Sequence, residues 1–332
     1  MPEELDSLNL NLAIVFGAAV LDVLIGDPWS WLHPVQVMGA WISWGHRILY
    51  RCCGAGWPRR LAGVALGLGT IAGSASISWA LVRVATQLQT YLGLGVAIVL
   101  LASCLAARSL HQAAWEVLQP LQAGKLEEAR SHLSRYVGRD TAGLSEPEIL
   151  RAVLETVAEN TTDGVTGPLF YALLGLWTGL GPVPLAMAYK AASTLDSMIG
   201  YRREPYTDLG WFSAQFEDRL TWLPCRLTVG AIALLSGRPW RVWRLCCRDA
   251  PQDPSPNSGW SECAYAAALG VRVGGENTYQ GIVKVKPLLG EAEQAIIVAT
   301  VLQALQLLRW TCWLWLGVGI VFPSLMLEFF GR

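Results

Sequence analysis

A charge-free run at residues 164–189, set between two polar clusters, constrains the fold more than any other stretch of the chain. The first cluster, residues 159–164, reads ENTTDG and supplies two carboxylates, one amide and two hydroxyls. The second cluster, residues 190–197, supplies one lysine, one aspartate and three hydroxyls. An apolar segment that serves only for burial needs no reactive groups at its ends. The arrangement therefore predicts a functional site around this run.

The middle of the run, GLGPVP at residues 179–184, is expected to form a turn because Gly and Pro interrupt helices. We interpret residues 165–189 as two half-length helices folded into a hairpin, which would bring both polar clusters to one side. A single spanning helix is the alternative, and hydrophobic periodicity fits both arrangements.

The composition is typical of a membrane protein with sizeable polar loops. The 332 residues are 53% hydrophobic and 15% charged, whereas soluble domains carry about 25% charged residues. We therefore expect a single all-α, polytopic integral membrane domain over residues 1–332, with hairpin or re-entrant segments and cytoplasmic helical loops. The net charge of −1 gives no argument for a nucleic-acid partner.

Hydrophobic runs and basic loops predict the topology. The expected spans are at about residues 8–25, 61–82, 92–107 and 310–327, with the hairpin at 165–189 and a further candidate at 221–236. That last segment is short for a span, and a re-entrant or interfacial position fits it equally. The excess of Arg and Lys in loops places the polar sections 26–60, 108–164, 190–220 and 237–294 on the cytoplasmic side. A multi-pass protein of the cell (inner or plasma) membrane follows, with its site facing the cytoplasm.

Smaller patterns add local expectations. Small residues of the 61–82 span, such as Gly63 and Gly69, suit close helix packing. The acidic N-terminus does not resemble a cleaved signal peptide. Eight cysteines without CxxC or Cys/His ligand spacing are expected to be reduced thiols rather than a metal site or a disulfide framework.

A helix is predicted before the first polar cluster. Ser145 and Glu148 match a capping box, and the apolar residues that follow share one helical face. Glu148, Glu155 and Glu159 line the opposite face. For Glu155, a solvated surface position and a place in a carboxylate site are both open.

Glu159 and Asp163 are the strongest candidates for chemistry, because an amide and hydroxyls lie between them at the mouth of an apolar segment. Mg²⁺ is commonly held by one or two carboxylates together with substrate phosphates. The competing interpretation is that Thr162 or Asp163 caps the next helix.

Two further polar groups are candidates for anion binding. Lys190, with Asp196 six residues on, suits a phosphate or carboxylate contact, although such a lysine often only reaches to the membrane interface. The loop at residues 253–260 is stiffened by two prolines, and its Ser-Gly pair can present amides to an anion. A rigid loop before a helix is the alternative there. Walker A, GxGxxG, HExxH and GxSxG motifs are absent from the sequence.

Together, these elements resemble the CobD/CbiB family of cobalamin biosynthesis, adenosylcobinamide-phosphate synthase. The resemblance extends from about residue 22 to residue 287, with the motifs in the family order. It is carried by GDPWSWLHPVQVMG, ETVAENTTDGVTGPLFY, AYKAASTLDSMIGYRREPYTDLGWFSAQFED and PSPNSGWSECAYAAALGVRVGG.

The resemblance implies an integral membrane ligase that uses ATP and Mg²⁺. It would join the free carboxyl of adenosylcobyric acid to the amine of (R)-1-amino-2-propanol O-phosphate, or of aminopropanol, to give adenosylcobinamide phosphate. Amide formation requires an activated carboxylate, for example an acyl phosphate, together with a metal, cations for phosphates and a base for the ammonium. The implied partners are the corrinoid, the aminopropanol phosphate, the lipid membrane and other cobalamin-pathway membrane enzymes.

The resemblance also assigns residues. Glu159, Asp163 and Asp196 are expected to bind Mg²⁺ and, with Lys190, to form the catalytic set, in which Lys190 contacts phosphate. Asn257 and Ser258 are expected to bind ATP or the aminopropanol phosphate. Further expected substrate- or nucleotide-binding residues are Asn160, Thr161, Thr194, Ser197, Tyr201, Gly259 and Trp260, together with Asp27 and His33, for which a structural turn is the alternative.

Two other functions remain open from the sequence. Membrane relatives of the AmpE type, linked to β-lactamase regulation, need not share the reaction, so a non-catalytic regulator is the main alternative. A transporter is the third, because polar groups beside a broken helix also form transporter sites. The position of the ionisable groups in predicted loops, away from mid-membrane, argues against a transporter.

Overall fold

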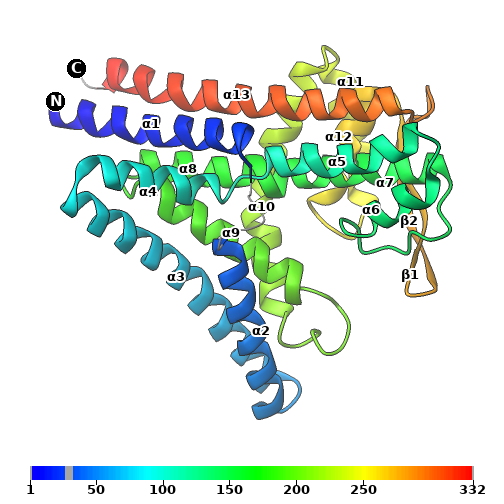
Figure 1. The fold of residues 1–332 in the computed structure, drawn as a ribbon, viewed down its shortest axis with the longest axis horizontal. Coiled ribbons are helices and arrows are strands. Elements are labelled where there is room, and N and C mark those ends of the chain that lie inside the picture. Colours follow the sequence, from blue (N-terminus) through cyan, green and yellow to red (C-terminus); the bar gives the residue numbers. More distant parts are fainter. Residues whose placement is uncertain (1, 27–32, 331–332) are drawn as a thin grey trace. The chain divides into compact units, whose positions relative to one another are not determined.

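The computed structural model describes residues 2–26 and 33–330, with side chains over residues 8–26 and 33–319. The described chain is mainly helical, as predicted, and its strands form one two-stranded hairpin that the sequence patterns do not predict (Figure 1). It divides into two compact units. Unit 1 comprises residues 1–106, 167–221 and 315–332, and unit 2 comprises residues 107–166 and 222–314.

Unit 1 is a set of helices centred on α9. Its elements are α1 (Pro2–Leu24), α2 (Pro34–Cys52), α3 (Trp57–Leu88), α4 (Thr90–Ala102), α8 (Gly167–Trp177), α9 (Pro182–Ile199) and parts of α10 (Trp211–Leu235) and α13 (Val298–Phe330). Helix α9 contacts α8, α3 and α2, and α3 contacts α4. The polar residues at 190–197 therefore lie in a packed helix, where the sequence predicts the start of a polar section.

The charge-free run forms two helices, as the hairpin interpretation predicts. Helices α8 and α9 pack against each other, and the chain reverses between them. Gly179 and Gly181 adopt positive φ angles of 76° and 84°, which glycine tolerates. The amide of Gly181 donates to the carbonyl oxygen of Gly175 at 3.0 Å and closes the turn. The alternative of one continuous helix is wrong.

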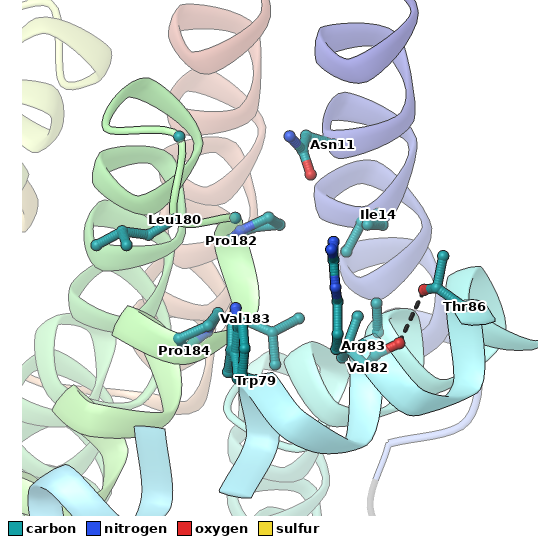
Figure 2. A pocket seen from close by; sticks show the side chains of 13 residues that line it. Asn11, Ile14, Trp79, Val82, Arg83, Thr86, Leu180, Pro182, Val183 and Pro184 are labelled. Atoms are coloured by element: carbon teal, nitrogen blue, oxygen red, sulfur yellow. Dashed lines mark hydrogen bonds between the residues drawn. The ribbon is translucent and has the colours of Figure 1, made fainter. Parts of the chain in front are cut away.

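A cavity of about 230 Å³ lies beside this turn in unit 1. Figure 2 shows Leu180 and Pro182 of the turn region facing Asn11 of α1 and Arg83 of α3 across it. Arg83 is the only charged residue between positions 61 and 107. The cavity therefore brings a lone cation beside the hairpin turn.

Among residues 8–26 and 33–319, α3 is the one helix that is long and apolar enough to cross a membrane. Helices α4 and α5 (Ala107–Gln122), separated by a short break, would by length and composition make a second such segment if they formed one span. Residues 8–24 form a shorter apolar helix, and the predicted segment 221–236 lies mostly in α10. The predicted span at 310–327 extends beyond the described side chains. The multi-pass arrangement stays a prediction.

Unit 2 combines helices with the β-hairpin. Its elements are α5, α6 (Leu126–Leu133), α7 (Glu146–Thr161), the π-helical turn η1 (Thr162–Thr166), α11 (Pro239–Asp249), the 3-10 turn η2 (Ala250–Gln252), α12 (Ser258–Leu269), β1 (Arg272–Tyr279), β2 (Ile282–Gly290) and the remainder of α10 and α13. The strands are antiparallel, with Gly275 opposite Lys286. Helix α12 contacts α7, α11 and both strands, so it forms the centre of this unit.

The β-hairpin depends on a bulge between Val273 and Gly275. Gly274 and Gly275 have φ angles of 90° and 91°, and a Cβ at Gly274 would overlap the carbonyl oxygen of Pro287. Only glycine fits such a position without strain. The same glycines weaken the strand pattern in the sequence, which explains why it does not predict the hairpin.

Helix α7 begins as predicted. The Ser145 amide donates to the Glu148 carboxylate at 2.7 Å, and the Ser145 and Glu148 side chains complete the capping box. The apolar face of α7, including Ile149 and Leu154, is fully buried. The helix then passes into the π-helical turn η1, a type of distortion that occurs often at functional sites.

Glycines of α3 differ in what surrounds them. A Cβ at Gly63 would overlap the carbonyl oxygen of Leu209, which lies in unit 1 just before α10. A Cβ at Gly69 would meet nothing within 4 Å. The predicted role of small residues in close packing is thus confirmed at Gly63 but not at Gly69.

We expect Gly63→Ala to lower the free energy of unfolding by about 1–3 kcal/mol, because the new methyl group requires the backbone near Leu209 to move. Gly69→Ala is the matched control on the same helix. It should be neutral or stabilising by up to about 1 kcal/mol, because alanine is the better helix former. Denaturant unfolding followed by circular dichroism measures both. Equal stability of the two variants would contradict the close approach at Gly63.

Candidate functional site

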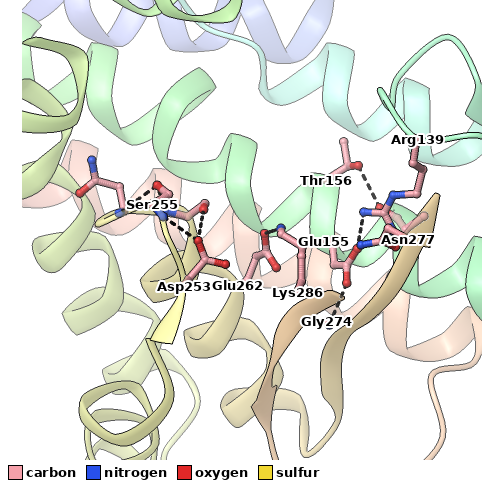
Figure 3. Close-up of polar contacts among 12 residues, drawn as sticks. Arg139, Glu155, Thr156, Asp253, Ser255, Glu262, Gly274, Asn277 and Lys286 are labelled. Atoms are coloured by element: carbon pink, nitrogen blue, oxygen red, sulfur yellow. Dashed lines mark hydrogen bonds and ion pairs between the residues drawn. The ribbon is translucent and has the colours of Figure 1, made fainter. Parts of the chain in front are cut away.

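Four titratable side chains from separate elements of unit 2 interact electrostatically. They are Glu159 of α7, Asp253 after η2, Glu262 of α12 and Lys286 of β2, and we call them the Lys286 cluster. Figure 3 shows Asp253, Glu262 and Lys286 in a row, with Glu155 beyond Lys286. The cluster holds three carboxylates and one cation.

Glu262 and Lys286 form the buried part of the cluster. The Lys286 ammonium donates to Glu262 Oε1 at 2.8 Å, and the Glu262 side chain is 1% exposed. The other oxygen, Oε2, has no hydrogen-bond partner among the described residues. Burial raises the pKa of Glu262 to about 8, although the charge of Lys286 opposes the shift. Burial alone would lower the pKa of Lys286, but the neighbouring carboxylates outweigh it and raise that pKa.

Glu159 differs from Glu262 because its side chain is exposed to solvent. The surrounding protein nevertheless desolvates Glu159, and this desolvation raises its pKa. The charge of Lys286 lowers the pKa of Glu159, whereas the charges of Asp253 and Glu155 raise it. Glu159 is therefore the carboxylate of the cluster that a ligand from solution can reach.

Glu155 lies one helical turn before Glu159 and has a structural role. Its side chain is 2% exposed and pairs with Arg139 at 2.5 Å and with Arg151 at 3.5 Å. The same carboxylate accepts the amide of Gly274 at 2.9 Å. A solvated position for Glu155, one of the two interpretations left open by the sequence, is therefore wrong.

This network fixes the β-hairpin on α7. Arg151 donates to the carbonyl oxygens of Gly274 and Glu276 in β1, next to the Glu155 contact. Arg151, Glu155 and Glu159 follow each other at four-residue spacing, so they share one face of α7. Because Lys286 is opposite Gly275 in the sheet, fastening β1 to this face brings Lys286 towards Glu159.

We expect Arg139→Met to lower the free energy of unfolding by about 3–5 kcal/mol, because it leaves the buried Glu155 carboxylate short of a partner. Arg135→Met is the control. Its guanidinium is 57% exposed and lies 3.9 Å from Glu116, so its loss should cost no more than about 1 kcal/mol. Denaturant unfolding compares the two. Similar losses would show that the Glu155 network does not stabilise unit 2.

The first predicted signature lies at the end of α7 and in η1. Asn160 donates to the carbonyl oxygen of Thr156 at 2.9 Å, and the fully buried Thr161 hydroxyl is 2.8 Å from the Tyr265 hydroxyl. The Thr162 hydroxyl is 2.7 Å from that of Ser261 on α12, in place of a helix-capping contact. The hydroxyls of this signature thus join α7 to α12, and Asp163 follows within η1.

The second signature lies on α9 in unit 1. Lys190, Thr194 and Ser197 follow a helical spacing that places them on one face of α9, and Tyr201 lies just beyond the end of the helix. The Thr194 hydroxyl donates to the Lys190 carbonyl oxygen at 2.7 Å, and the Tyr201 hydroxyl to that of Ser197 at 2.8 Å. Both are contacts within the segment itself. Convergence of Asp196 with Glu159 and Asp163 on one Mg²⁺ stays a prediction.

The third signature is a loop held by its own side chains. Asp253 accepts from the Ser255 amide at 2.8 Å, and Ser255 Oγ accepts from the amides of Asn257 and Ser258 at 3.2 Å each. Asn257 Oδ1 accepts from Arg226 at 2.8 Å, and that guanidinium also lies over the Trp260 ring at 4.7 Å.

These contacts favour the interpretation as a rigid loop before a helix. A Cβ at Gly259, the second residue of that helix, would lie 2.5 Å from the Asp253 side chain, so the loop packs closely against the start of the helix.

The first motif is described only in part. Asp27 lies outside the described residues. His33 is the N-cap of α2, and its Nδ1 accepts from the Val35 amide at 3.2 Å. This contact supports the structural-turn alternative for His33.

Sequence reasoning missed Glu262 and Lys286 as partners. A signal for Glu262 was available, because it is the only charged residue at positions 258–269, which form an otherwise uncharged helix. A charge in such a setting is usually paired when it is buried. No pattern near Glu262 indicates which cation pairs with it, because Lys286 lies 24 residues further along the chain.

Among the side chains of residues 8–26 and 33–319, no group of three or more His, Cys, Asp or Glu is arranged to hold a metal ion. The donor set still fits a Mg²⁺–nucleotide, because that ion needs only one or two carboxylates beside phosphates and water. Glu159 is accessible, and Asp253 Oδ2 has no hydrogen-bond partner in the described chain. The structure contains no disulfide bond among the eight cysteines, all of which lie in the described chain.

Comparison with known proteins identifies the class. The CobD/Cbib protein family matches residues 15–308, so the chain belongs to the CobD/CbiB family of cobalamin biosynthesis. A cobalamin biosynthesis protein CobD of Synechocystis sp. is 54% identical over 94% of this chain and 92% of its own length. CobD of Halalkalibacterium halodurans is 44% identical over 86% and 88%, and CbiB of Salmonella typhi is 40% identical over 88% and 91%. No solved structure matches the chain.

Proposed function

We propose that this protein is an ATP-dependent acid–amine ligase of cobalamin biosynthesis. It would join adenosylcobyric acid to (R)-1-amino-2-propanol O-phosphate, or to aminopropanol, and give adenosylcobinamide phosphate. Membership of the CobD/CbiB family supports the pathway. The observation that most supports a ligase is the accessible Glu159 carboxylate beside the only cation of the Lys286 cluster.

The reaction would make a C–N bond, break the bond from carbon to one carboxylate oxygen and remove two of the three ammonium protons, while ATP is cleaved to ADP and a phosphate that carries the oxygen away. When bound, ATP with Mg²⁺ would turn that oxygen into a phosphate leaving group. Glu159, Asp163 and Asp196 are the proposed ligands of the metal, and Lys190 the proposed phosphate contact. The hydroxyl bonds from Thr161 and Thr162 to α12 would keep Glu159 and Asp163 in place during turnover.

We propose that the protein works at the cell membrane as a multi-pass enzyme, with the Lys286 cluster on the cytoplasmic side. Large apolar side chains along α3 are exposed, among them Leu61 at 62%, Ile77 at 63% and Leu88 at 75%. Exposed apolar surface of this extent suits contact with lipid. Other membrane enzymes of the cobalamin pathway are proposed neighbours.

The non-catalytic regulator predicts a different biochemical outcome. It would show no ATP turnover that depends on a corrinoid. The family match does not favour it, because the matched relatives are cobalamin biosynthesis proteins.

We expect Glu159→Gln, Asp163→Asn and Lys190→Ala each to reduce amide formation at least about 100-fold, the lower range for loss of a catalytic group. Glu127→Gln is the control, because Glu127 lies on α6 with its side chain 83% exposed. Purified protein is given adenosylcobyric acid, aminopropanol phosphate, ATP and Mg²⁺, and mass spectrometry measures the product.

Full turnover by all three variants would contradict the assigned site. Folded wild-type protein that makes no product with either the phosphorylated or the unphosphorylated amine would contradict the ligase itself.

A further inference from the structure

Lys286 is the one cation available to a ligand at the cluster. Arg139, the other cation whose charge acts on Glu159, is already paired with Glu155. Three carboxylates therefore share one ammonium. Any anion that approaches Glu159 meets repulsion from these carboxylates unless Lys286 offsets it.

Lys286 connects the buried and the accessible parts of the cluster. Its side chain is 27% exposed, whereas that of Glu262 is 1% exposed. An ammonium has three hydrogen-bond donors, and Glu262 Oε1 takes one of them. Because the Lys286 side chain is partly exposed, the remaining donors can meet a ligand, and Glu159 of the same cluster is open to solvent.

We propose that Lys286 binds the substrate carboxylate that becomes the amide, and that Glu262 is a positioning residue that holds the Lys286 ammonium. This inference rests on the ligase function proposed above. It adds a recognition role for strand β2 and for the buried face of α12.

The charge of the cluster favours a carboxylate over a polyphosphate. One ammonium can balance one carboxylate of unit charge. A triphosphate carries several negative charges, so beside Glu159, Asp253 and Glu262 it would need Mg²⁺ as well as the one lysine, whereas a carboxylate needs the lysine alone.

Glu262 has a clear reason to be the positioning group. A lysine has a flexible four-carbon stem, so its ammonium needs a fixed partner to stay in one place. Glu262 is held in the centre of unit 2 on α12, and its second oxygen has no hydrogen-bond partner in the described chain. A buried carboxylate with one unpaired oxygen costs free energy of folding. The contact that Glu262 makes is the hydrogen bond from the Lys286 ammonium, so positioning that ammonium is a reason for the carboxylate to be there.

The test measures binding of cobyric acid to the purified full-length protein, without ATP or Mg²⁺, by equilibrium dialysis read from corrin absorbance. Lys286→Met should weaken binding about 10- to 100-fold, the loss typical of one hydrogen bond to a charged group. Lys284→Met is the matched control, because Lys284 is exposed on the same strand and lies 5.5 Å from the centre of the Tyr279 ring.

Cobinamide, in which the same carboxyl is already an amide, is the matched probe. Lys286→Met should leave its binding unchanged, and Lys286→Arg should restore most of the affinity for cobyric acid. Unchanged binding of cobyric acid to Lys286→Met, or an equal loss for cobinamide, would overturn the assignment. Wild-type protein that binds neither corrinoid would instead contradict the proposed function.

A double-mutant cycle tests the positioning role. Glu262→Gln should weaken cobyric acid binding in the wild-type background and have no further effect in Lys286→Met, because Glu262 acts through Lys286. Additive losses would overturn this role. Lys286→Met leaves the buried Glu262 carboxylate without its partner, and this variant could unfold for that reason. The double variant removes both buried charges together, so it should fold even in that case.

Discussion

The buried carboxylate of Glu155 is the interaction on which the site in unit 2 depends. A carboxylate that is 2% exposed is tolerated only with several partners, and it has two guanidinium groups and one backbone amide. Because the amide belongs to Gly274, the requirement to satisfy this charge also fixes strand β1 on α7. The position of Lys286 on the neighbouring strand follows from that contact.

Two glutamates one turn apart on α7 have different roles because their surroundings differ. Glu155 is sealed between arginines and the β-hairpin, so it acts as a structural anchor. Glu159 is open to solvent and meets the charge of Lys286, so it is available for chemistry. The π-helical turn that follows changes the helix geometry directly beside Glu159, where hydroxyls bond α7 to α12.

Unit 1 combines close helix packing with exposed apolar surface. Its helices pack closely where glycine allows, as at Gly63, yet α3 leaves many large apolar side chains exposed. Exposed apolar surface of this kind is costly in water and favourable in lipid. The α8–α9 hairpin lies in this unit, and its polar residues are carried on a packed helix.

The sequence by itself determined the family, the helical class, the start of α7 and the break between α8 and α9. The family depends on motifs in order along the chain and the class on composition, whereas the last two depend on patterns within a few residues, the Ser145 capping box and the glycines and prolines at 179–184. Only the tertiary structure decided that Glu155 is buried, that residues 272–290 form a β-hairpin and that Lys286 pairs with Glu262. The physical reason is that burial and charge pairing depend on contacts between elements that are far apart in the sequence. Local sequence patterns do not indicate which of these elements pack against each other.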